Sequence, residues 1–137
     1  MYGLKVLLIV QSLSAAQPTN IRVLVLDGNN GTPLRGHIVE IYSNQPAPDP
    51  IVRGATDQNG LLTVAAPLPS QIAVHVKGRY LCSGKHHGTF VQALKDIVST
   101  GVADENLCAP KVSRHARPGE LILYVRRETI SELLDLK

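Results

Sequence analysis

Apolar and polar residues alternate along most of the chain between residues 21 and 125, and this pattern predicts a protein built from short β-strands. Turn residues interrupt the alternation about every ten positions, which is typical of an antiparallel sandwich. Long helices between the strands, the mark of a parallel α/β sheet, are not indicated. The expected strands span residues 21–26, 36–43, 51–56, 61–65, 71–77 and 119–125.

The phase of the alternation predicts which side chains face the core. In the strand 21–26 both phases are apolar, so we expect this strand to be covered on both sides or to lie near the middle of a sheet. The residues predicted to point inward in the other strands are Val39, Ile41, Leu62, Val64, Ile72, Val74, Val76, Leu121, Leu123 and Val125.

Residues 56–64 form the clearest combination of a turn and a strand. Polar residues lead to Asn59 and Gly60, and an alternating run follows at once. We expect Asn59 and Gly60 to supply the positive φ of a tight turn that joins two antiparallel strands. The similar stretch 27–31 separates the first two strands, and the three prolines within 44–50 predict a surface loop.

Residues 83–107 break the β pattern and predict one short helical insertion. Apolar residues recur at helical spacing, and suitable capping residues stand at both ends. The apolar positions are Phe90, Leu94, Ile97 and Val98, the N-cap is Thr89 and the stop is Gly101. In residues 126–137, the spacing of the apolar side chains suits a marginal helix or a frayed tail.

The first sixteen residues have the pattern of a secretory signal peptide. Lys5 precedes a short apolar run that starts at Val6, and small residues at 14–16 favour cleavage before Gln17. We therefore predict a signal peptide at 1–16 and one domain at 17–137, in a secreted or periplasmic protein. The alternatives are a buried first strand and an uncleaved anchor. In the mature chain no other segment is long or apolar enough to span a membrane.

Composition is consistent with one globular domain. The chain has 137 residues, of which 44% are hydrophobic and 18% charged. Its formal net charge of +3 is too small a bias to indicate a nucleic-acid partner, and the mature chain keeps only three Tyr and one Phe for stacking on bases or sugars.

The two cysteines, Cys82 and Cys108, favour a disulfide in an exported protein. The bridge would close a loop of about 26 residues around the expected helix. For that length the chain-entropy relation gives a stabilisation of roughly 3 to 3.5 kcal/mol. A metal site would need more thiolates or histidines at ligand spacing, and a catalytic thiol would need a reduced, electropositive setting.

Several of these segments resemble the carboxypeptidase regulatory-like domains. The sequences VLD at 25–27, TPLRG at 32–36 and VEI at 39–41 resemble the opening hairpin of that family. The turn ATDQNG at 55–60 is similar to its most recognisable motif. IAVHV at 72–76 with GRY at 78–80 resembles a later strand and its ending.

The end of the domain extends the resemblance to short secreted bacterial proteins that carry this domain alone. The sequence that carries this part is PGELILYVR at 118–126. The resemblance implies an Ig-like or prealbumin-like sandwich of about seven strands that is non-catalytic and needs no cofactor. Its enzymatic relative, the transthyretin-like hydroxyisourate hydrolase, ends in Tyr-Arg-Gly-Ser, whereas this chain ends in LDLK.

Other candidate chemistry has simpler explanations. The sequence lacks G-x-S-x-G and H-E-x-x-H, and adjacent His86 and His87 suit a solvated loop better than a metal pair. Turn chemistry explains the oxygen-rich stretches 27–31 and 57–60 better than calcium does. The basic residues form either a patch for an anionic partner or solvated loop charge. They are Lys111, Arg114, His115 and Arg117, with Arg126 and Arg127 after the last strand.

The sequence therefore predicts a non-catalytic, exported binding or accessory module at the cell envelope, with a protein or a glycan as its unknown partner. The alternatives are a domain that recruits another protein through an exposed edge strand and a transthyretin-like hydroxyisourate hydrolase.

Overall fold

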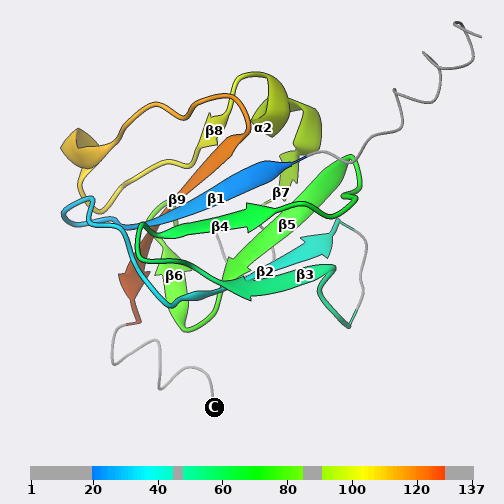
Figure 1. Cartoon of the computed structure of the whole chain (residues 1–137). Helices are drawn as coiled ribbons and strands as arrows, with labels where there is room; N and C mark the ends of the chain where they lie inside the picture. The colour runs from blue at the N-terminus through cyan, green and yellow to red at the C-terminus, as the bar shows by residue number, and fades with distance from the viewer. Residues whose placement is uncertain (1–19, 45–47, 85–90, 129–137) are drawn as a thin grey trace, which may run out of the picture.

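Nine strands form two facing sheets in the computed structural model, which describes residues 20–44, 48–84 and 91–128 (Figure 1). The five-stranded sheet has the order β4-β1-β9-β6, and β8 also pairs with β9. The four-stranded sheet has the order β3-β2-β5-β7. The predicted all-β sandwich is confirmed, with nine described strands instead of about seven.

The bounds of the elements are as follows. The five-stranded sheet contains β1 (Ile21–Asp27), β4 (Leu61–Val64), β6 (Arg79–Leu81), β8 (Val102–Ala103) and β9 (Glu120–Arg127). The four-stranded sheet contains β2 (Ile38–Ser43), β3 (Val52–Ala55), β5 (Gln71–Val76) and β7 (Val91–Ala93). The helices among the described residues are α2 (Leu94–Ser99) and the 3-10 turn η1 (Pro110–Val112).

The space between the sheets holds the main core. All the residues predicted to point inward lie in this core or against it, with Leu62 partly buried at its edge. Its fully buried members include Ile21, Ile41, Ile72 and Leu121. Because each of these strands has one apolar phase facing the opposite sheet, alternation alone was enough to identify this face.

The strands are not all antiparallel. β1 lies between β4 and β9, and it is antiparallel to β4 but parallel to β9, with Val23 beside Leu121. β8 is also parallel to β9. Alternation reports which face a side chain occupies, but it does not report the direction of the neighbouring strand.

Contrary to the prediction from the sequence, the turns at 27–31 and 57–60 do not join neighbouring strands of one sheet. The turn 27–31 closes locally through an antiparallel bridge between Leu26 and Pro33, but the chain then crosses to the other sheet. β3 and β4 belong to different sheets, as do β1 and β2. In the turn 57–60 only Gly60 has a positive φ, of 76°, and none of the described non-glycine residues does. The buried Gly60 packs on β1 instead, since its carbonyl accepts from the Val25 N–H at 2.9 Å.

The helix between the cysteines is shorter than predicted. Residues 91–93 form β7, which pairs with Gln71–Ala73 at the open edge of β5, and α2 begins only at Leu94. In the strand conformation, residues 91–93 form hydrogen bonds with the edge of β5, which a helical turn at the same place would not form. Within α2, Ile97 is buried and Gly101 ends the helix with a φ of 78°, as expected. The predicted cap and first apolar residue lie outside the described residues.

Candidate functional site

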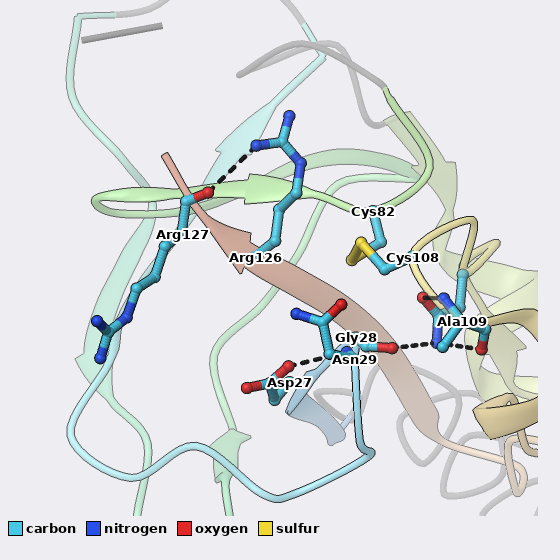
Figure 2. The surroundings of a disulfide bond; sticks show 9 residues. Asp27, Gly28, Asn29, Cys82, Cys108, Ala109, Arg126 and Arg127 are labelled. Carbon is cyan, nitrogen blue, oxygen red and sulfur yellow. Dashed lines mark hydrogen bonds between the residues drawn. A yellow bond between two sulfur atoms is a disulfide. The ribbon is translucent and has the colours of Figure 1, made fainter. Parts of the chain in front are cut away.

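Cys82 and Cys108 form the predicted disulfide, with their Cα atoms 5.4 Å apart. Cys82 directly follows β6, and Cys108 lies in the long segment between β8 and β9 (Figure 2). In Figure 1 this yellow-to-orange segment runs along the side of the five-stranded sheet that faces away from β2, β3 and β5. The bridge therefore fastens residues 104–119, which we call the covering segment, to the outside of the sandwich.

A second, smaller core lies beneath that segment. Its buried members are Leu24, Leu26, Cys82, Ile122 and Tyr124, and partly buried Leu61, Cys108 and Ala116 pack against them. The side chains from β1 and β9 alternate with those of the main core, so the five-stranded sheet is buried on both faces. This confirms that β1 is covered on both sides. The same double apolar phase in β9, with Ile122 and Tyr124, was a signal that the sequence analysis did not use.

Hydrogen bonds hold the covering segment in place. Asn106 is 2% exposed, and its Nδ2 donates to the carbonyls of Gly28 at 2.9 Å and Ala109 at 3.0 Å. The Arg114 backbone N–H donates to the hydroxyl of buried Tyr124 at 2.8 Å. The covering segment therefore has a structural role on this side of the molecule, where it shields the second core from solvent.

The outer face of the four-stranded sheet is different, because no described element packs on it as a second layer. A row of ionic side chains crosses three strands there. The Glu40 carboxylate lies 3.2 Å from His75 Nδ1 and 3.8 Å from Arg53 Nε. The Glu40 side chain at the centre of the row is 15% exposed, whereas the Arg53 side chain at one end is 54% exposed to solvent.

An apolar row lies beside the ionic one. Tyr42 is next to Ala73 in the ladder, and Ala73 is next to Val91. Val91 is 38% exposed, and Ile51, which precedes β3, is 43% exposed. Burial against the sheet raises the pKa of Tyr42 above its usual value, and the charge of Glu40 raises it further. We call Tyr42, Ile51, Val91, Glu40, Arg53 and His75 the open face.

A hollow of about 580 Å³ lies beside the open face, where β5 begins and α2 follows β7. Its lining residues are Ser70, Gln71, Ala93, Leu94, Lys95 and Val98. Lys95 is the single titratable side chain among these described lining residues, so they supply no acid–base pair.

The oxygen-rich turns form local hydrogen bonds, as expected from turn chemistry. Asp27 Oδ1 accepts from the Asn29 N–H at 2.8 Å, and Asp57 Oδ1 accepts from the N–H groups of Asn59 and Leu61 at 2.8 and 3.0 Å. Within the part of the chain that the structure describes, no group of three His, Cys, Asp or Glu residues could hold a metal ion. His86 and His87 lie outside it.

The basic residues near the C-terminus are spread along β9 and the segment that precedes it. Arg117 precedes β9 and Arg127 ends it, so β9 separates the two by about 23 Å at roughly 3.3 Å per residue. Lys111, Arg114 and His115 are exposed on the covering segment. Among the described helices, none is long and apolar enough to cross a membrane.

Comparison with known proteins does not show a family for this chain. No family model matches the sequence, and no curated protein matches it significantly. Among solved structures, the chain is similar to BcpA, the major pilin subunit of Bacillus cereus, with 17% sequence identity and a TM-score of 0.44. The alignment covers 81% of this chain and 30% of the pilin chain, so it spans under a third of that subunit.

Proposed function

We propose that this chain is an exported, non-catalytic binding module of the carboxypeptidase regulatory-like kind, which contacts another protein at the cell envelope. In this proposal residues 1–16 are a signal peptide that is removed, and residues 17–137 are the module. The sequence resemblance, the leader pattern and a disulfide suited to an oxidising compartment support it.

One observation carries the proposal: the two sheets differ in what covers them. The five-stranded sheet is buried on both faces, whereas none of the described residues forms a second layer over the outer side of the four-stranded sheet, where the open face lies. A mixture of apolar side chains and partly desolvated ion pairs is typical of protein interfaces. A glycan would be better served by several aromatic platforms, and Tyr42 is the single aromatic side chain of the open face.

Pairing through an edge strand is the less favoured mode. The outermost strands of the sheets, β3, β4, β6, β7 and β8, have four residues or fewer. Short edge strands are one way in which proteins avoid pairing with other chains.

Site-specific photo-crosslinking in cells tests the proposal. A photo-reactive residue at Ile51 or at Val91 should give one discrete adduct with an envelope protein, which mass spectrometry identifies. The same residue at Leu107, which is 57% exposed on the covering segment, is the matched control and should give none. Adducts at Leu107 alone, or at all three positions equally, would contradict the proposed surface.

The compartment needs a separate measurement. Terminal sequencing of the protein recovered from the envelope or the medium should find Gln17 as the first residue. An intact leader, or two free thiols in the recovered protein, would overturn export with cleavage.

A further inference from the structure

Two arginines lie directly opposite each other at one end of the five-stranded sheet. β6 and β9 are antiparallel, and their register pairs Arg79 with Arg127 and Leu81 with Val125. Leu81 and Val125 both belong to the main core. Because side chains alternate along a strand, Arg79 and Arg127 lie on the same inner face, two residues beyond the end of that core.

Figure 2 shows the neighbouring Arg126 and Arg127 side chains leaving β9 in opposite directions. Arg126 lies over the ring of Tyr80, with its guanidinium carbon 5.1 Å from the ring centroid. Arg126 is therefore engaged on the outer face, and Arg127 extends from the inner one.

Arg79 is held in position from the opposite sheet. Its Nε donates to Nε2 of His37 at 3.2 Å, and His37 Nδ1 lies 2.9 Å from the carbonyl oxygen of Arg35. Since a guanidinium nitrogen only donates, His37 Nε2 must accept, and the ring proton is then on Nδ1, where it donates to Arg35. A neutral imidazole therefore orients the guanidinium and adds no charge of its own.

No carboxylate neutralises the two arginines within the residues that the structure describes. The ion pairs among the described residues join Glu40 to Arg53 and to His75, on the other sheet. Asp27 ends the neighbouring strand β1, but its Oδ1 accepts from the Asn29 N–H and it makes no ion pair with Arg127.

Like charges directly opposite each other in a sheet are destabilising, so this pair calls for a compensating anion. We propose that Arg79 and Arg127 form a binding site for a dianionic oxyanion group of the phosphate or sulfate class at this end of the sandwich. Two guanidinium forks match such a group in charge and offer planar, paired donors to its oxygens. His37 is the positioning residue, because it acts through Arg79.

The test is a titration of the folded protein with inorganic phosphate, and in a second series with sulfate, at constant ionic strength. Nitrogen-detected NMR of the arginine side chains should show saturable shifts at Arg79 and Arg127. Acetate, a monoanion, should bind at least about tenfold more weakly. The variant Arg127→Gln, whose side chain is exposed and makes no contact needed by the core, should weaken phosphate binding at least about tenfold, the loss expected for one charge-assisted hydrogen bond.

The exposed Arg114, whose backbone rather than side chain bonds to Tyr124, offers the matched control Arg114→Gln, which should leave phosphate affinity unchanged. Without phosphate, Arg127→Gln should unfold at the same or a higher temperature than the wild type, because it removes the repulsion. Phosphate should then no longer raise that temperature. Shifts that do not saturate, or equal phosphate affinity in the wild type and Arg127→Gln, would overturn the site. Neither result would bear on the open face, which belongs to the other sheet.

Discussion

The sulfur of Cys82 occupies the space in which a side chain on Gly28 would begin. A Cβ at Gly28 would also come within 3.0 Å of Asn106 Oδ1 and 3.2 Å of Cys108 Cβ. The φ of Gly28 is not positive, so the position needs glycine for space and not for conformation. The first turn of the chain is thereby fitted to a disulfide that closes much later in the sequence.

Replacement of Gly28 by Ala should therefore destabilise the oxidised protein. We expect a loss of about 1 to 3 kcal/mol in the free energy of unfolding, the usual range for overpacking. Denaturant titration measures it. In a Cys82→Ala, Cys108→Ala background the cost of Gly28→Ala should fall, because the sulfur that clashes is gone. An equal cost in both backgrounds would show that the sulfur is not the obstacle.

Removal of the disulfide itself should loosen one side of the sandwich before the other. We expect Cys82→Ala with Cys108→Ala to lower the free energy of unfolding by about 3 kcal/mol, as for a loop of this length. Amide hydrogen exchange should accelerate most in residues 104–117 and in the strand segments beneath them. The amides of β2 and β5, which face the main core alone, are the internal control. Equal acceleration in both sheets would contradict a separate second core.

Local alternation was sufficient to predict the inner faces of the strands, because each face depends on residues two positions apart. It also predicted that β1 is covered on both sides, but it did not predict that the covering segment forms the second cover. The burial of Asn106 had no sequence signal, since its partners are the carbonyls of Gly28 and Ala109. Such contacts depend on which distant segments meet.

Sheet membership was the part that the sequence could not supply. A polar stretch that ends in glycine is compatible with a hairpin and equally with a connection between two sheets. In this protein Gly60 packs on Val25 of β1, and the turn connects the two sheets. The same limit applies to the proposed anion site. Nothing in the local sequence pairs Arg79 with Arg127, and the register of β6 with β9 brings them together.

Thr56, in the connection between β3 and β4, bonds to the connection between β1 and β2. We expect its hydroxyl to contribute more to stability than its methyl group. The side chain is 4% exposed, and Oγ1 donates to the Leu34 carbonyl at 2.6 Å and accepts from the His37 N–H at 3.0 Å. Thr56→Val keeps the shape but leaves both groups without this partner, so we expect a loss of about 1 to 3 kcal/mol. Thr56→Ser keeps the hydroxyl and is the control in the same denaturant titration. Equal losses in both variants would assign the effect to packing.

Tyr42 gives the open face a signature at alkaline pH. Burial, and then the charge of Glu40, raise the pKa of this phenol above its usual value of 10.0, so the folded protein keeps a proton that the unfolded chain has lost. The stabilisation is fully present below the unfolded pKa and is lost as pH rises through the higher folded pKa. Unfolding titrations at increasing alkaline pH should show this decline in the wild type, and Tyr42→Phe should remove its share.

The two causes can be separated in the native protein. Ultraviolet absorbance of the phenolate in the wild type, with Tyr42→Phe as the blank, gives the midpoint of the Tyr42 titration. Glu40→Gln removes the negative charge but not the burial, so it should lower this midpoint. A midpoint that stays unchanged in Glu40→Gln would contradict a contribution from Glu40. The raised pKa would then come from burial against the sheet.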